Sequence, residues 1–591
     1  MFNLMFKMTF RGSLLLYGVF FLTLIWPYWI SGDVITPHLQ FLELKIEDQI
    51  VAKQIENYYF SDFVLNYIPK ITEHFNAPRS SFLALWTNRT ELGLPLNHLS
   101  GFSSAYLPTW IISSWVDDPW SLITTLSLGM CFLAGFFILL FAREVGLSPL
   151  SGLISGLGMA ASPFFMFWLT FPMFITVGCW AAGSLWAVTR LAKCPDILGW
   201  SVLAFSGYSL LITGYPQAVV IHAYLLSGYW LWLARSQVRT SQLALVKFLM
   251  LTVSALIVGA GLSYPIYRDL YITYTESARF SPDISWFIAR LPNLTNFSEL
   301  VRFFVLSTAP EIFGNPINRG SYPLPYDGYK VISSSFIVIF FAIFALFTIF
   351  KKTWGWWLAI LILYLLSLVH PLYELAIKYF GFNLSRSSPL ACALLPLTII
   401  TAFGIDVLVK RTYNYQFAKA VFAVGSIMLI VIVIGVAFGI SQNIPIHWGS
   451  VVGLLILLLL LIAQYDRTRP KFLILALGIV LIMTSYPLML KQDPLKIAMS
   501  SPLTERIKSN LQQGSRYAII APGDKSMLRP NLNVTLGLSS IHSYNSLSSH
   551  RYHTLIKSLG GKVYSYGRHN RAISPDYAGT MFWISNVGLI L

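Results

Sequence analysis

The sequence predicts an all-α polytopic membrane protein with about 13 transmembrane helices and a small outer C-terminal α/β or β-rich segment. Of its 591 residues, 55% are hydrophobic and 11% are charged, whereas soluble domains carry roughly a quarter charged residues. Apolar runs long enough to cross a bilayer recur from residue 13 to residue 490. The Lys and Arg residues collect in every second connector between these runs, which is the usual orientation signal of membrane proteins.

The individual spans follow from length, because a helix needs about 20 residues to cross the hydrocarbon. The first run follows Lys7 and Arg11 but ends in the interfacial aromatics Trp26-Pro27-Tyr28-Trp29, which favours a retained span over a cleaved signal. The predicted spans lie near 13–31, 120–141, 148–167, 172–190, 197–213, 217–234, 244–266, 331–350, 354–370, 389–409, 419–440, 448–464 and 472–490.

The net charge of +16 reflects this orientation signal rather than a nucleic-acid surface. The basic residues of the connectors fall on one side of the membrane, and they are Arg143, Arg190 with Lys193, Arg235 with Arg239, Lys351-Lys352, Lys410-Arg411, and Arg467 with Arg469. Because this side is the cytoplasmic one, the N-terminus is predicted inside and the C-terminus outside.

The chain therefore divides into a transmembrane domain, 1–490, and an outer C-terminal segment, 491–591. Its long loops, 32–119 and 267–330, also lie outside, and long loops are usually functional. Within the first loop, the apolar spacing over 38–57 predicts an amphipathic helix along the interface or packed on the loop's own core. No Walker or dinucleotide-binding motif occurs, so ATP-driven transport has no support.

A candidate general base stands in the first outer loop. Asp62 lies in an aromatic setting, with Tyr67, Lys70 and His74 within three helical turns. Such surroundings raise a carboxyl pKa and suit it to take a proton from a hydroxyl, although a structural carboxylate is the alternative. Asp33 is a rival, and a divalent metal held by Asp33 and Asp62 is a further alternative. Asp117 and Asp118 are interpreted as interfacial charges.

Several short motifs, in a fixed order along the chain, resemble the YfhO-type bacterial membrane proteins. In the first loop they are Ser61-Asp62-Phe63, Tyr67-Ile68-Pro69, Leu85-Trp86-Thr87-Asn88, Leu92-Gly93-Leu94-Pro95-Leu96 and Tyr106-Leu107-Pro108. Further along they are Gly214-Tyr215-Pro216-Gln217, Ser277-Ala278-Arg279, Pro310 with Phe313-Gly314, Arg386 ahead of a span ending Gly404-Ile405-Asp406, Pro530-Asn531, Ser543-Tyr544-Asn545-Ser546-Leu547 and Arg551-Tyr552.

The resemblance implies a GT-C-like membrane glycosyltransferase in the bacterial cytoplasmic (inner) membrane. Such an enzyme moves a sugar from polyprenyl phosphate to an envelope glycan, polymer or lipid on the outer side. The catalytic aspartate then falls on Asp62. A guanidinium grips phosphate bidentately, so Arg386 is the first candidate for the lipid phosphate, and Arg279 and Arg268 are the second. The substrate-binding candidates are Tyr67, Lys70, His74, Trp86 and Asn88.

Two departures from the family pattern qualify this expectation. Tyr215 stands where the family has a histidine, which makes catalysis at that position improbable. The chain stops at Gly588-Leu589-Ile590-Leu591, so we expect a shortened outer segment whose last apolar strand lacks partners. A transporter or flippase of lipid-linked saccharides, or a non-catalytic envelope scaffold, is the alternative function.

Overall fold

The structure is a computed structural model of the chain. It describes residues 9–36, 62–76, 86–95, 105–213, 215–277, 296–314, 334–381, 388–410, 415–463, 470–491, 493–494, 502–518, 531–543, 545, 548–558 and 586–590. The predicted amphipathic helix 38–57 lies outside these residues, as do Arg279 and Arg386.

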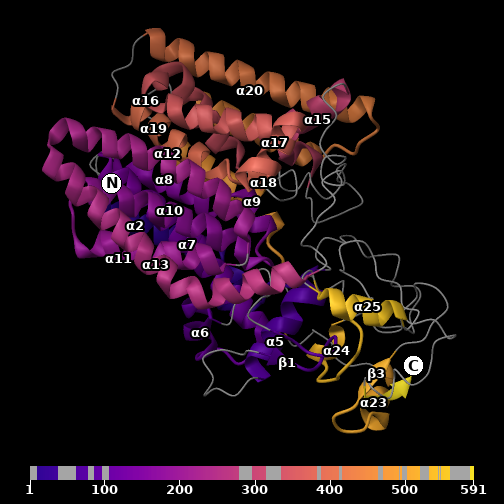
Figure 1. Cartoon of the computed structure of the whole chain (residues 1–591). Coiled ribbons are helices and arrows are strands. Elements are labelled where there is room, and N and C mark those ends of the chain that lie inside the picture. The colour runs from indigo at the N-terminus through magenta and orange to yellow at the C-terminus, as the bar shows by residue number, and fades with distance from the viewer. Residues whose placement is uncertain are drawn as a thin grey trace.

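A helix occupies each of the predicted spans, and the helices pack as one bundle (Figure 1). The first half contains α2 (Phe10–Leu24), α3 (Trp26–Ile30), α7 (Pro119–Glu144), α8 (Pro149–Ala160), α9 (Pro163–Phe167), α10 (Pro172–Lys193), α11 (Ile197–Ile212), α12 (Pro216–Thr240) and α13 (Gln242–Glu276). The second half contains α16 (Phe336–Leu368), α18 (Ser388–Ala391), α19 (Leu394–Lys410), α20 (Tyr415–Ser441), α21 (Trp448–Ile462), α22 (Pro470–Val480), η7 (Leu481–Ser485) and η8 (Tyr486–Leu488).

Among the described residues, six helices are long and apolar enough to cross a membrane alone, and four shorter apolar helices accompany them. The multi-pass membrane architecture is therefore confirmed, while several predicted spans are shorter or broken. Ser162 and Pro163 divide the predicted span 148–167 into α8 and α9, because proline begins a new helix more easily than it continues one. The predicted spans 331–350 and 354–370 correspond to the two parts of α16, which meet at a kink where the backbone of Ile349 is non-helical.

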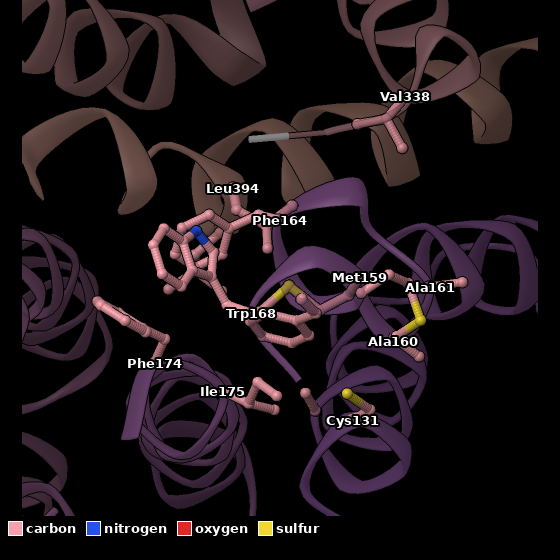
Figure 2. Close-up of a cluster of buried hydrophobic side chains, with 14 of the residues drawn as sticks. Cys131, Met159, Ala160, Ala161, Phe164, Trp168, Phe174, Ile175, Val338 and Leu394 are labelled. Carbon is pink, nitrogen blue, oxygen red and sulfur yellow. The ribbon is translucent and has the colours of Figure 1, made fainter. Parts of the chain in front are cut away.

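Close helix packing holds the first half of the bundle together. Gly135 of α7 faces Gly156 of α8, so the two backbones approach more closely than any Cβ would allow. The hydroxyl of Tyr17 donates to the carbonyl of Phe132 at 2.6 Å beside this contact. Figure 2 shows the neighbouring core, where Trp168 and Phe164 lie against Leu394 of α19 and thus join the two halves.

The outer elements are short. In the first loop they are η3 (Phe63–Tyr67), α5 (Ile68–Asn76), the antiparallel pair β1 (Trp86–Thr87) and β2 (Leu94–Pro95), and α6 (Leu107–Ser113). The second loop and the following stretch hold α15 (Phe297–Thr308), η4 (Pro310–Phe313) and α17 (His370–Phe380). The predicted loop 267–330 therefore begins as helix, because α13 continues to Glu276.

The C-terminal segment is a small mixed α/β unit, which agrees with the α/β form of the prediction. Its elements are α23 (Pro502–Asn510), β3 (Arg516–Ala518), α24 (Leu532–Thr535), α25 (His550–Ser558) and β4 (Val587–Ile590). β4 pairs in parallel with β3, so the expectation of a last strand without a partner is wrong. These elements lie below the bundle, beside α5 and β1 of the first loop (Figure 1).

Candidate functional site

The helix that follows Asp62 starts with a widened turn whose cause is Pro69. In an α-helix, the amide of residue 69 would donate to the carbonyl of Leu65, but proline has no N–H and its ring crowds that carbonyl. The chain instead forms the π-helical turn η3, in which the amide of Ile68 donates to Phe63 O. Turns of this kind insert one extra residue into a helix and are frequent at functional sites.

The widened turn sets Asp62 and Lys70 on one face of the helix. Eight α-helical steps would rotate the two side chains about 80° apart, because each step turns 100°. Removing one step for the inserted residue leaves about seven, which is close to two complete turns. The carboxylate of Asp62 accordingly acts electrostatically on the amine of Lys70.

The Lys70 side chain is buried, with 8% of the residue exposed. Its Nζ has no hydrogen-bond partner in the described part of the chain, and lies 6.0 Å from the centre of the Tyr67 ring. Burial lowers the pKa of Lys70 to about 7, against the raising effects of Asp62 and Glu91. A cation without hydrogen bonds in such a place is costly, and an anionic ligand would relieve that cost.

Glu91, from the strand segment 86–95, also acts electrostatically on Lys70. Its backbone is left-handed, with φ at +56°, and its side chain is buried, with 4% of the residue exposed. The hydroxyls of Ser543, at 2.7 Å, and Ser548 donate to its carboxylate. Burial raises the pKa of Glu91, while these hydrogen bonds and Lys70 lower it. Two carboxylates therefore act on Lys70, one half-buried at Asp62 and one buried at Glu91.

Hydrogen bonds join the C-terminal segment to the first long loop. The side-chain amide of Asn531 donates to the carbonyl of Leu65, inside the widened turn, at 2.8 Å. Its oxygen accepts from the hydroxyl of Thr90 at 2.9 Å. The amide of Asn533 donates to Arg89 O at 2.6 Å. Two segments more than 400 residues apart thus form one unit.

An ion pair links the same loop to α5: Arg89 Nη1 lies 3.0 Å from Glu73 Oε1. The Glu73 side chain is 10% exposed and the Arg89 side chain 31% exposed, so the pair is only partly screened by water. Together with the buried Ile68 and Ile71, this pair fixes α5 against the strand segment 86–95.

The predicted substrate-binding residues divide into packed and exposed groups. The hydroxyl of Tyr67 contacts Met173 Sδ at 2.9 Å and its ring meets Phe171 edge-on. His74 Nε2 lies 3.3 Å from Ser113 Oγ, and burial lowers the His74 pKa. These two side chains face neighbouring helices.

Trp86 and Asn88 lie on the surface of the same loop. The indole of Trp86 donates to Asn88 Oδ1 at 2.8 Å. Trp86 is 55% exposed, and its ring covers Gly93, where an added Cβ would lie 2.7 Å from the ring. An exposed indole held in one orientation suits stacking on a sugar.

The remaining predicted residues have separate places. Arg268 is exposed on α13, whereas Arg386 and Arg279 lie outside the described residues. Asp118 caps α7 by accepting from the amides of Trp120 and Ser121 at 2.9 and 2.8 Å. Across the described ranges, no group of three or more His, Cys, Asp or Glu residues is placed to hold a metal ion.

Sequence reasoning missed two residues of this site. Glu91 and Asn531 were not singled out for chemistry, although Asn531 belongs to one of the motifs of the resemblance. Pro69 inside a helical pattern was the available signal, because it implies a carbonyl that must find another donor.

Comparison with solved structures shows similarity to three membrane-protein systems. The first is the arabinofuranosyltransferase AftD from Mycobacteria, with a TM-score of 0.46 and 11% identity over 88% of this chain and 30% of that chain. The second is ArnT from Cupriavidus metallidurans bound to undecaprenyl phosphate, with a TM-score of 0.41 and 15% identity over 90% of this chain and 85% of that chain. The third is the archaeal oligosaccharyltransferase AglB from Archaeoglobus fulgidus in complex with an inhibitory peptide and a dolichol-phosphate, with a TM-score of 0.39 and 12% identity over 98% of this chain and 68% of that chain. The chain thus spans under a third of the length of AftD. No protein-family model and no curated protein matches it.

Proposed function

We propose that the protein is a GT-C-like membrane glycosyltransferase of the YfhO type, which transfers a sugar from polyprenyl phosphate to an envelope glycan, polymer or lipid. The site lies at the outer face of the bacterial cytoplasmic membrane, with the N-terminus inside and the C-terminus outside. The observation that carries the proposal is the buried ammonium of Lys70, two helical turns from Asp62 and without a hydrogen-bond partner in the described residues.

The two groups divide the chemistry of an inverting transfer. The Asp62 carboxylate takes the proton of the acceptor hydroxyl, whose oxygen forms the new bond to the anomeric carbon. The bond from that carbon to the phosphate oxygen breaks, and its electron pair leaves with the lipid phosphate. The Lys70 ammonium stabilises the charge that builds up on this phosphate, which is most effective where water is excluded.

Other residues complete the proposed site. Trp86 presents an exposed indole for stacking on a sugar, and Asn88 holds its orientation through the indole N–H. Arg386 stays our first prediction for a second cation on the lipid phosphate, and Arg279 and Arg268 stay the second candidates. The motif order that resembles the YfhO-type proteins supports the substrate class, and Lys70 supports the presence of an anion.

The test is the Asp62→Asn substitution in the full chain, reconstituted in lipid nanodiscs with a panel of polyprenyl-phosphate-linked hexoses. Loss of a general base costs about 10²–10⁴-fold in rate, so transfer should fall by that factor. Asp33→Asn tests the rival base: if Asp62 takes the proton, transfer by Asp33→Asn should stay unchanged. Transfer by Asp62→Asn within a few-fold of the unsubstituted protein contradicts the proposal. Absence of transfer with retained lipid movement across the bilayer indicates the flippase.

A further inference from the structure

In an α-helix the carbonyl of Leu65 would accept from the amide of residue 69. Residue 69 is proline, so the α-helical donor is missing by chemistry rather than by distortion. Leu65 is buried, with 6% of the residue exposed, and a buried carbonyl without a donor destabilises the fold. The side-chain amide of Asn531 supplies the missing hydrogen bond at 2.8 Å.

Asn531 is itself fixed in place. Its backbone is left-handed, with φ at +70° at the start of α24, a conformation that Asn tolerates better than most residues. Its side-chain oxygen accepts from Thr90 at 2.9 Å, which orients the amide so that the NH₂ points to Leu65. The residue is 4% exposed, so water does not compete for these bonds.

We propose that Asn531 is a positioning residue, which stabilises from the C-terminal segment the widened turn that Pro69 imposes and thereby keeps Asp62 on the same face as Lys70. This inference rests on the proposed function for its consequence in catalysis. It makes the C-terminal segment a structural part of the reaction site rather than an appended unit.

The direction of the effect follows from which part of the helix is anchored. The ion pair of Glu73 with Arg89 and the buried Ile68 hold α5 in place. The bond from Asn531 is made inside η3, so its loss releases the turn that carries Asp62 rather than α5. Lys70 stays buried and loses the carboxylate that raises its pKa.

The ionisable groups around Lys70 are few. Asp62 on its own helix and Glu91 from the strand segment both raise its pKa. Of the other elements packed against α5, α24 carries no ionisable side chain, and Asp118 at the start of α7 is engaged in capping that helix. If Glu91 keeps its place, a change in the pKa of Lys70 therefore reports a change in the position of Asp62.

The experiment measures the titration of Lys70 directly, by the pH dependence of its acetylation with acetic anhydride, read by mass spectrometry on the full chain in detergent. This readout needs no glycosyl transfer, so it stands even where the proposed function fails. Asn531→Gly keeps the left-handed backbone without strain and removes the donor. Its apparent Lys70 pKa should fall by about one pH unit.

Two further variants separate positioning from general destabilisation. Asn533→Ala removes another bond between the same two segments, the one to Arg89 O, but leaves the Asn531 donor to Leu65, and should leave the Lys70 titration unchanged. In an Asp62→Asn background, Asn531→Gly should add no further fall, because the carboxylate it positions is already gone. An unchanged titration in Asn531→Gly, or an equal fall in both backgrounds, overturns the proposal.

Discussion

Replacing Lys70 by Met should make the protein more stable while removing its function. The buried amine has no hydrogen-bond partner in the described residues to lose, and Met has nearly the same length and fills the same space. Burial lowers the pKa of Lys70 from 10.5 to about 7. At about 1.4 kcal/mol per pH unit, this fall corresponds to a folding cost of about 5 kcal/mol at most.

The pH dependence has a definite sign. Because the pKa of Lys70 is lower in the folded chain, the unfolded chain binds the proton more tightly, and stability rises with pH between about 7 and 10.5. The cost is fully present below pH 7 and vanishes near pH 10.5. Lys70→Met should therefore exceed the unsubstituted protein in stability at pH 6, with the advantage shrinking as the pH rises toward 9.5.

The assay is the thermal unfolding midpoint in detergent, measured for both proteins from pH 6 to 9.5. Lys378→Met is the matched control, because Lys378 is exposed and pairs only with Glu374 one turn away. It should shift the midpoint little at any pH. A lower midpoint for Lys70→Met at pH 6, or an advantage that does not depend on pH, refutes the interpretation of Lys70 as a buried cation held for a ligand.

Two further outcomes follow from the same structure. The affinity for undecaprenyl phosphate should decrease as the pH rises from 6 to 9, because only the protonated Lys70 pairs with the anion; equal affinities by calorimetry at the two ends would contradict this. Gly135→Leu should lower the free energy of unfolding by about 1–3 kcal/mol or more, because its side chain would meet Gly156 and Tyr17. Gly129→Leu is the control, because a Cβ there meets nothing within 4 Å. Both variants are compared by chemical denaturation.

The membrane helices were predictable because length and hydropathy are local properties. The range 120–141 became α7 (Pro119–Glu144) and 172–190 became α10 (Pro172–Lys193), each starting at a proline that suits the first helical position. Breaks inside apolar runs were less visible. The break at Ser162-Pro163 falls inside a predicted span, whereas the kink at Ile349 lies beside Lys351-Lys352, where the sequence predicted the end of one span.

The site was predictable in part. Asp62 and Lys70 share an aromatic stretch, and the sequence places them within three helical turns. Their alignment on one face depends on the extra residue that Pro69 forces into the turn, which could have been inferred. The donor for Leu65 could not, because Asn531 lies 466 positions away and no local periodicity records such a pairing. Glu91 was hidden for the same reason, since its partners lie in the C-terminal segment.

The most direct test of the central claim is a cryo-electron microscopy structure of the full chain with undecaprenyl phosphate bound. The claim is that a buried amine in the first outer loop receives the lipid phosphate. A phosphate oxygen within about 3 Å of Lys70 Nζ, the length of a charge-assisted hydrogen bond, is the predicted result. Phosphate density against Arg268, with the Lys70 amine still enclosed by apolar side chains, would contradict it.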